Sequence, residues 1–387
     1  MNSNEVYITG TGAFLPGEPV ENDNIIDFLG DPGPVSRLKN KILKSNGIKK
    51  RYYAMRKGGV PTFLSEDMAE KAIVTAIESA QITPKQLDCI AAGSSIPELF
   101  VPSLCQLIHG RLGRHGAGPL KTIPTAGVCL AGMTALESAF WQVKSGNRNC
   151  IAVCGVERVS VAIRSSRFKL EFENKKQLAD ADPTYSHFHG AFLPWMLSDV
   201  AGSLIVQNVP NPDKPSLRID WIETTSYANE LPTCMWAGTN DRNNSDPSNT
   251  WMAQESALVA EQKGMIVLRQ DTSLLEKYIA PYGLKELTRI INTGKLLPAE
   301  IDVFLPHLSS FFFKEEILRH FNEAGIDLGE EKWFTNLEYT GNTGSAAIFI
   351  IIDEALKSGR IKRGDKVLIM VPESARFAYC YAQFTCV

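Results

Sequence analysis

The sequence predicts an α/β protein built from two similar halves, and three observations support this. Short apolar runs bounded by Gly, Pro and Asp alternate with amphipathic stretches of helical period, which is typical of buried sheets covered by helices. Related strings recur about 214 residues apart along the chain. The Pro- and Asn-rich stretch 208–216 lies between the two sets of strings and is typical of a crossing from one half to the next.

Six short apolar runs are predicted to be strands, because each is bounded by turn residues. They are 6–16, 87–95, 149–157, 203–208, 301–309 and 366–374. Three amphipathic stretches are predicted to be helices, at 65–80, 132–146 and 344–359. The last two end on the string KSG, which predicts a Gly just past the end of each helix.

The internal repeat fixes how the two halves correspond. The string ITPKQLDCI (82–90) resembles LLPAEIDVF (296–304), with Pro and Asp at the same spacing, and KSG recurs at 144–146 and 357–359. Three matches in register indicate one strand-helix plan used twice. We therefore divide the chain into an N-terminal half, 1–210, and a C-terminal half, 211–387.

Composition excludes several classes of function. The chain has 387 residues, 44% of them hydrophobic, a net charge of −3 and a pI of about 6.1. With no excess of basic residues, broad binding to nucleic acid is not expected. The start MNSNEVYITG lacks the profile of a signal peptide, and the run AAIFIII is far shorter than the roughly 20 residues of a membrane span. We expect a cytoplasmic protein with no membrane span.

Eight cysteines occur without the spacing of a metal site or the context of a disulfide framework. No CxxC pair is present, and the six histidines do not lie beside cysteines at ligand spacing. Four of the cysteines lie in or beside apolar runs, where a free thiol behaves as a small hydrophobic group. We expect neither disulfides nor a bound metal.

Cys129 is different because it lies in AGVCLAGMTALESAFWQVKSG (126–146), where an apolar segment gives way to a helix. Unpaired N–H groups at a helix N-terminus stabilise a thiolate, which is the reactive form of cysteine. Small neighbours permit close approach to a thioester carbonyl. The alternative is that Cys129 only packs in the core. The repeat favours a catalytic role for Cys129, because Cys129 and Asn342 occupy matching positions in the two halves. Cys129 lies 15 residues before Lys144, and Asn342 lies 15 residues before Lys357.

His307 and Asn342 complete a candidate site with Cys129. The repeat pairs His307 with Gly93, at the C-terminal end of a strand, and in parallel sheets these ends face the same side as helix N-termini. A neutral imidazole and an uncharged amide can both donate to a developing enolate oxygen. The alternatives are a structural histidine and an Asn that serves a turn or an N-cap.

These residues and their flanks resemble the thiolase superfamily, and within it the type III β-ketoacyl-acyl-carrier-protein synthases. The resemblance covers nearly the whole chain. It rests on 6–25, 45–54, 82–103, the Cys129 segment, PHLSS (306–310) and GNTGSAA (341–347), in the order that the family has them. It implies a thiolase-like fold of two pseudo-symmetric βαβαβαββ halves in a five-layered αβαβα arrangement, and a homodimer.

The resemblance also implies a role for each site residue. Cys129 would take the acyl group from a thioester as covalent nucleophile. His307 and Asn342 would stabilise the enolate of a second thioester, which attacks that acyl group. The backbone N–H groups of Cys129 and Ser374 would form the oxyanion hole; Ser374, in PESARF, stands where the family usually has Gly.

The family resemblance also implies how the acyl substrates are carried to the site. The stretch HLSS replaces the family's HQAN, placing Ser310 where an Asn helps hold the pantetheine arm, and 38–47 has no Trp of the kind that grips the adenine of coenzyme A. It implies no cofactor of the protein's own, and substrates carried on the phosphopantetheine of acyl carrier protein or on coenzyme A, with the carrier protein favoured. A basic cluster near the N-terminus is expected to be mostly solvated, and part of it to meet an acidic carrier protein. The cluster comprises Arg37, Lys39, Lys41, Lys44, Lys49, Lys50 and Arg51.

The strings GAFLPGEPVEN, SNGIKKRYYA and GVERVS look closest to the ketosynthase/cyclases of bacterial dialkylresorcinol and stilbene pathways. Those enzymes join two β-ketoacyl thioesters and close a ring, for which a further acid/base group is useful. Glu157, in GVERVS, is the candidate for that group; the alternative is a carboxylate paired with Arg158 or with a neighbouring subunit.

Other functions compete with this one. A type III synthase making a linear β-ketoacyl chain is the nearest rival, and a Cys–His–Asn hydrolase or a non-catalytic scaffold are more distant. Two polar stretches, 167–190 and 228–252, carry no strong signal beyond a possible part in the substrate tunnel or dimer face. The first holds His187 and His189, spaced like metal ligands but without an evident third.

Overall fold

The fold is described by a computed structural model that covers residues 4–31, 39–168, 192–243 and 245–387. Its principal strands are β1 (Tyr7–Phe14), β6 (Cys89–Ser94), β7 (Lys121–Ala126), β8 (Cys150–Glu157), β9 (Val200–Gln207), β10 (Leu217–Ser226), β13 (Val303–Pro306), β14 (Lys366–Glu373) and β15 (Ala378–Cys386). Short strand pairs are β2 (Val20–Glu21) with β3 (Lys50–Arg51), β4 (Met55–Arg56) with β5 (Val60–Pro61), and β11 (Met235–Trp236) with β12 (Arg269–Gln270).

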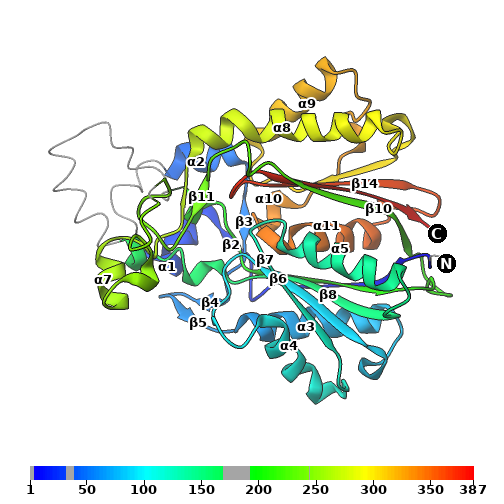
Figure 1. The fold of residues 1–387 in the computed structure, drawn as a ribbon, viewed down its shortest axis with the longest axis horizontal. Coiled ribbons are helices and arrows are strands. Elements are labelled where there is room, and N and C mark those ends of the chain that lie inside the picture. Colours follow the sequence, from blue (N-terminus) through cyan, green and yellow to red (C-terminus); the bar gives the residue numbers. More distant parts are fainter. Residues whose placement is uncertain (1–3, 32–38, 169–191, 244) are drawn as a thin grey trace.

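The helices separate into outer and inner sets. The outer layers hold α3 (Ser65–Ser79) and α4 (Leu104–Leu112) on one side, and α8 (Thr272–Asn292) and α9 (Phe312–Glu323) on the other. The inner layer holds α5 (Ala131–Lys144) and α11 (Ala347–Lys357) (Figure 1). The remaining helices are α1 (Ile25–Leu29), α2 (Lys39–Asn46), α7 (Ala257–Gln262) and α10 (Leu337–Thr340).

The nine principal strands run in the order β13-β14-β15-β10-β1-β9-β8-β6-β7. Strands β1 and β10 pair only through Tyr7 with Arg218 and Ile8 with Leu217, so a short seam joins a part built from residues 7–207 to a part built from 217–386. Viewed in Figure 1, the layers follow one another as helix, sheet, helix, sheet, helix. The expected five-layered α/β arrangement is confirmed.

The repeat is visible in the order of elements. The first half runs β1-α3-β6-α4-β7-α5-β8-β9, which is βαβαβαββ, and the second runs β10-α8-β13-α9-α11-β14-β15. One strand of the expected second half is missing among the described residues: only an isolated bridge joins Phe304 to Trp333. Trp333 follows a short 3-10 turn and packs its ring edge-on against Phe304, at 5.1 Å between ring centroids.

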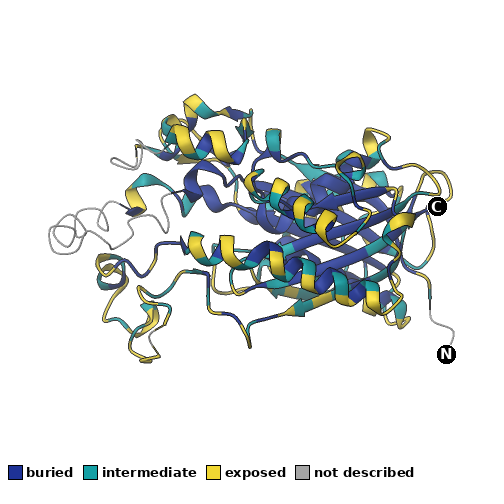
Figure 2. Cartoon of the chain, turned by 90° about the horizontal axis from the view of Figure 1, so that it is seen from above, coloured by how far each residue is buried: buried dark blue, intermediate teal, exposed yellow. Residues whose placement is uncertain are grey.

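One large core lies between the two parts of the sheet. Side chains of α5 and α11 pack there against strands of both parts, while separate clusters lie under α3 and α4 and under α8 and α9. Figure 2 shows the strands buried and the exposed positions gathered on the outer helices and loops. Gly146 and Gly359 follow the ends of α5 and α11 at φ of +73° and +71°, as the KSG strings predicted.

No helix among the described residues has the length and apolar character needed to cross a membrane.

Candidate active site

Cys129 lies in the turn that joins β7 to α5, two residues before the helix begins. Its side chain is 8% exposed. Gly127 starts the turn at φ +145°, a backbone conformation that favours glycine. A Cβ at Gly127 would also lie 3.1 Å from a carboxylate oxygen of Glu373. The strand-to-helix transition read from the sequence is therefore confirmed, and it presents a buried thiol.

Glu373, at the end of β14, holds this turn from the other half of the chain. Its Oε2 accepts hydrogen bonds from the backbone N–H of Val128 at 3.1 Å and of Leu130 at 3.3 Å. Burial raises the pKa of the Glu373 carboxyl, and the two hydrogen bonds oppose that rise. Glu373 was not among the site residues predicted from the sequence. The feature that could have identified it is an acidic side chain immediately before Ser374, in a segment expected to face Cys129.

The expectation that the helix N-terminus stabilises a Cys129 thiolate needs correction. Burial raises the pKa of the Cys129 thiol strongly, and the nearby carboxylates of Glu373 and Glu157 raise it further. Burial is the largest cause of this rise, and the two carboxylates act in the same direction. The resting form of Cys129 is therefore the neutral thiol.

Asn342 lies just before the 3-10 turn Gly344–Ala346 that leads into α11. Its side-chain Oδ1 accepts a hydrogen bond from the Gly344 N–H at 3.1 Å, while its backbone pairs with Met196 and Ser198. The side chain thus caps a turn, as one alternative predicted. Because Oδ1 is the atom used, the two Nδ2 hydrogens remain oriented away from the cap, so capping and donation to a substrate are compatible.

Two glycines allow this turn to reach the first half. A Cβ on Gly132 of α5 or on Gly155 of β8 would lie 2.2 Å from the carbonyl oxygen of Ser345. Only hydrogen fits at these positions, so the turn that carries Asn342 packs directly on the elements that carry Cys129 and Glu157. Close backbone packing between the halves therefore places the amide near the thiol.

His307 follows β13 directly, at the strand end that the repeat predicted. Its backbone N–H donates to Met370 of β14 at 2.8 Å, which continues the ladder by one residue. The side chain is 2% exposed, and its Nε2 has no hydrogen-bond partner among the described residues. Burial lowers the pKa of His307 to about 4, so the imidazole is neutral at physiological pH.

Four of the five predicted site residues line one cavity, which we call the cysteine cavity: Cys129, Asn342, Glu157 and Ser374. Its empty volume is about 600 Å³, and its other walls are mostly apolar. His307 instead lines an adjoining cavity of about 450 Å³, the histidine cavity. Ser309, two residues beyond His307, lines both cavities. The structure thus gathers the predicted residues around two neighbouring cavities with one shared wall.

Glu157 is held by serines rather than by Arg158. Its Oε1 accepts from Ser95 Oγ at 2.6 Å and from the Ser345 N–H at 2.9 Å. Burial raises the pKa of Glu157, and these hydrogen bonds oppose the rise. Arg158 forms its ion pair with Glu98. The alternative in which Glu157 pairs with Arg158 is therefore wrong, and Glu157 ties the end of β8 to the turn before α11.

Ser374 lies beyond β14, where its Oγ accepts a hydrogen bond from Gln270 Nε2 at 2.7 Å. Met235, from the 228–252 stretch, also lines the cysteine cavity, so that stretch contributes to its wall. In the basic cluster Arg51 was expected on a solvated face, but it is fully buried and donates to Asn22 Oδ1 and the Trp195 carbonyl. Arg37, His187 and His189, with most of 167–190, lie outside the described residues.

All eight cysteines are buried free thiols. Among the described residues no group of three or more His, Cys, Asp or Glu side chains is arranged to hold a metal ion.

Comparison with known proteins agrees with this geometry. Residues 291–371 match the family model described as 3-oxoacyl-[acyl-carrier-protein (ACP)] synthase III C terminal, and this segment contains both His307 and Asn342. The structure of 3-oxoacyl-[acyl-carrier-protein] synthase III from Aquifex aeolicus is similar to the chain, at 20% identity and a TM-score of 0.69, over 98% of this chain and 99% of that one.

Two further solved structures are similar over the whole chain. Xanthomonas campestris OleA with bound lauric acid and lauroyl-CoA has 17% identity and a TM-score of 0.73, over 100% of both chains. The tetronic acid condensing enzyme AbyA1 has 16% identity and a TM-score of 0.74, over 98% of this chain and 99% of that one.

These matches confirm the thiolase-like fold, and the family match confirms the resemblance to type III synthases in the C-terminal segment. The nearer resemblance to ketosynthase/cyclases stays a prediction.

Proposed function

We propose that the chain is a condensing ketosynthase that joins two acyl thioesters through an acyl-Cys129 intermediate. The observation that carries the proposal is that three groups line two neighbouring cavities that share Ser309. They are the buried thiol of Cys129, the side-chain amide of Asn342 and the neutral imidazole of His307, whose Nε2 has no partner among the described residues. A nucleophile and two uncharged donors are what acyl transfer followed by enolate stabilisation requires. The fold shared with AbyA1, OleA and the Aquifex synthase supports the same reaction class.

In the first step the acyl carbon of one thioester bonds to Cys129 Sγ, and the carrier thiol leaves with the cysteine proton. A neutral resting thiol suits this exchange, because proton and sulfur change places without net charge separation. The neutral His307 and the Asn342 amide then donate to the enolate oxygen of the second thioester. The apolar walls of the cysteine cavity accommodate the bound chain.

We further propose that both substrates are β-ketoacyl thioesters and that ring closure follows coupling, giving a cyclohexanedione or resorcinol precursor. The relative named as a tetronic acid condensing enzyme supports condensation of this kind on the same scaffold. We propose delivery on the phosphopantetheine of acyl carrier protein, or on coenzyme A, and a homodimeric assembly.

A linear-chain synthase is the second candidate, favoured by the family match of residues 291–371. Purified protein is incubated with paired β-ketoacyl thioesters and, separately, with an acyl thioester together with malonyl-carrier protein, and the masses of the products distinguish the two functions. A cyclic product from two β-ketoacyl units supports the first proposal. A linear β-ketoacyl product with release of CO2, and none from paired β-ketoacyl units, contradicts it.

A further inference from the structure

Gln270 and Ser374 form a polar pair in the wall of the cysteine cavity. Gln270, in β12, is only 3% exposed, and its side-chain Nε2 donates to Ser374 Oγ at 2.7 Å. The neighbouring wall is apolar, with Met235 and Leu268 from the same part of the chain. The proposed condensation uses at most the backbone N–H of Ser374, so it assigns no task to this pair of side chains.

Backbone hydrogen bonds hold the pair in one position. Met235 in β11 lies directly opposite Gln270 in β12. The N–H groups of Cys234 and Met235 both donate to the carbonyl of Ala375, at 2.8 Å and 3.1 Å. The strand pair that carries Gln270 is therefore bonded to the residue next to Ser374. The contact between the two side chains is thus supported from the backbone on both sides.

The hydrogen bond from Gln270 determines what the Ser374 hydroxyl can do. A serine hydroxyl accepts through its oxygen and has one hydrogen to donate. Because Ser374 Oγ accepts from Gln270, its hydrogen points away from that amide, and no acceptor for it occurs among the residues that the structure describes. Ser374 is only partly buried, so a bound molecule in the cavity can reach the hydroxyl.

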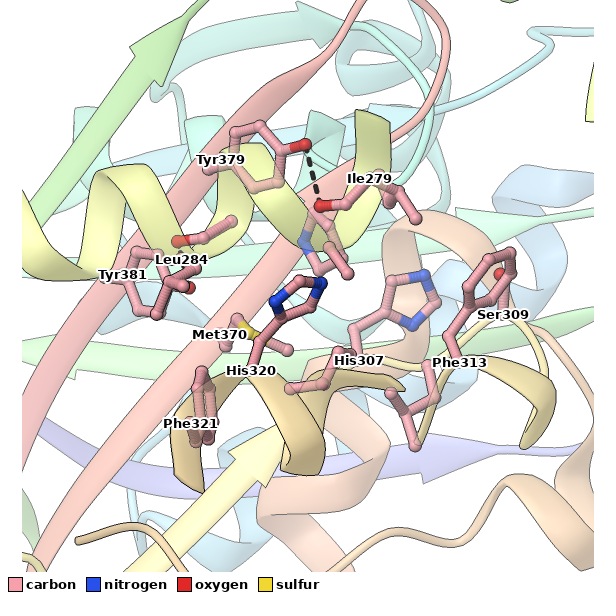
Figure 3. Close-up of a pocket in the computed structure, with 15 residues that line it drawn as sticks. Ile279, Leu284, His307, Ser309, Phe313, His320, Phe321, Met370, Tyr379 and Tyr381 are labelled. Atoms are coloured by element: carbon pink, nitrogen blue, oxygen red, sulfur yellow. Dashed lines mark hydrogen bonds between the residues drawn. The ribbon is translucent and has the colours of Figure 1, made fainter. Parts of the chain in front are cut away.

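Other donors around the site are engaged elsewhere. Ser95 also lines the cysteine cavity, but its hydroxyl donates to Glu157 at 2.6 Å. His307 lines the histidine cavity, where Figure 3 shows its ring next to that of His320. The Ser374 hydroxyl is therefore a donor of the cysteine cavity that the proposed reaction leaves unused.

A donor in an apolar wall favours a substrate that brings an acceptor to it. Covering a hydroxyl without giving it a partner costs free energy, so a saturated acyl chain on Cys129 is penalised at this place. The backbone N–H of Ser374 is expected to bond the thioester oxygen of that acyl group. The hydroxyl of the same residue lies close to this N–H, and the β-keto oxygen of a β-ketoacyl group lies close to the thioester oxygen, with a single carbon between the two carbonyls.

We propose that the Ser374 hydroxyl, oriented by Gln270, donates to the β-keto oxygen of the acyl group on Cys129 and so selects β-ketoacyl groups over saturated ones during loading. This inference rests on the proposed acyl-Cys129 intermediate. Ser374 is then a specificity-determining residue, and Gln270 is a positioning residue that acts through it. The bonds that form and break during loading are unchanged: the acyl carbon bonds to Cys129 Sγ, and the carrier thiol leaves with the cysteine proton.

The test measures loading alone, with β-ketooctanoyl-pantetheine and octanoyl-pantetheine as donors of equal chain length. Enzyme is in excess over thioester, and intact mass follows the acyl-Cys129 adduct. The intrinsic reactivity of each thioester is the same for every variant, so a change in the ratio of the two loading rates reports the protein. Ser374→Ala should lower the ratio of ketoacyl to octanoyl loading about tenfold, the effect of one hydrogen bond in a buried site. Ser374→Thr, which keeps the hydroxyl, should retain most of the ratio.

Gln270→Met tests the pair from its other side. It replaces the amide with an apolar side chain of similar length, and it should lower the ratio in the same direction as Ser374→Ala while octanoyl loading changes less than about twofold. If Gln270 only supported the structure, Gln270→Met would slow both donors equally. Ser309→Ala is the matched control, because it removes a hydroxyl from the same cavity and should leave the ratio unchanged.

The outcomes separate this inference from the proposed function. If Cys129 still loads and neither Ser374→Ala nor Gln270→Met changes the ratio, or if Ser309→Ala lowers it instead, the assignment of Ser374 is overturned and the proposed function stands. Wild-type protein that forms no acyl-Cys129 with either donor overturns the proposed function itself.

Discussion

Glu373 and Cys129 are held side by side by two hydrogen bonds that bracket the cysteine, from the N–H groups of Val128 and Leu130 to one carboxylate oxygen. The contact crosses from the second half of the chain to the first. It fixes the nucleophile turn and places a negative charge beside the thiol, which raises the pKa of Cys129 in addition to burial. The Glu373 carboxylate therefore holds the turn that carries Cys129, and we expect its charge to lower the reactivity of the thiol.

Glu373→Gln should make Cys129 more reactive toward iodoacetamide at neutral pH. The amide oxygen still accepts the two backbone hydrogen bonds, but the charge is gone, so the pKa of the thiol falls and the thiolate fraction rises. The rate of alkylation at Cys129, followed by peptide mass across pH 7 to 10, should rise several-fold at the lower end. Glu300→Gln, at an exposed carboxylate, is the control. Superimposable pH profiles for wild type and Glu373→Gln would contradict this role.

Cys129→Ala and Asn342→Ala should fail at different steps. The first removes the atom that takes the acyl group, so no acyl-enzyme forms. The second permits loading but slows coupling about 100- to 1,000-fold, the usual cost of one lost oxyanion donor. Asn342→Asp keeps the oxygen that caps Gly344 and replaces the donor, so it should behave like Asn342→Ala. Equal loss of loading in all three, by intact mass, speaks against this division.

His307 should make folding less favourable in acid. Its pKa is about 4 in the folded protein and about 6.5 when unfolded, so only the unfolded chain takes up a proton between these values. The free energy of unfolding therefore keeps its full value above pH 6.5 and decreases as pH falls toward 4, by about 3 kcal/mol at most.

Urea denaturation of wild type and His307→Gln from pH 4 to 7.5 measures this difference. The free energy of unfolding of wild type should fall relative to that of His307→Gln as pH decreases, because other titrating groups are common to both proteins. A difference that stays constant with pH would mean that His307 titrates normally.

Gly155→Ala should destabilise the protein and impair coupling more than loading. The added Cβ meets the Ser345 carbonyl at 2.2 Å, a backbone atom that has to move, which costs about 1–3 kcal/mol or more. That movement displaces the turn carrying Asn342. Gly110→Ala, in open space on α4, should instead stabilise by about 0.5–1 kcal/mol. Thermal unfolding and single-turnover coupling check both; equal stability of the two variants would show that the contact is not tight.

Glu157→Gln separates two roles of that carboxylate. If Glu157 supplies the proton transfers of ring closure, the variant should accumulate the linear coupled product and lose the cyclic one by at least about 100-fold. Product masses over time measure the ratio. Parallel loss of loading, coupling and cyclisation, with lowered stability, would assign Glu157 only to the tie between Ser95 and Ser345.

The repeat in the sequence was enough to predict the duplicated fold and the positions of Cys129, His307 and Asn342 at element ends, because register and periodicity are local properties of the chain. It did not predict that His307 lines a separate cavity, since that depends on how α8 and α9 pack on the sheet. Nor did it predict that the pKa of Cys129 is raised, because burial, the largest cause, and the charge of Glu373, more than 240 residues away in the sequence, both depend on tertiary packing.

Arg51 shows the limit of reading charge from a linear pattern. It lies among lysines that suggest a solvated surface, yet it is fully buried with its guanidinium bonded to Asn22 and Trp195. The pattern of charges along the sequence cannot reveal that Arg51 is buried, because its hydrogen-bond partners come from distant segments. The domain boundary, the homodimer and the carrier-protein contact stay predictions.

Strand β14 and the residue that follows it reach both cavities: Met370 and Pro372 line the histidine cavity, Glu373 holds the turn of Cys129, and Ser374, just beyond the strand, lines the cysteine cavity. A slip of one position in a strand turns every side chain to the opposite face, so an insertion here would disable several tasks at once. The register of β14 therefore has to be kept for both cavities and the turn of Cys129 to retain their present walls and contacts.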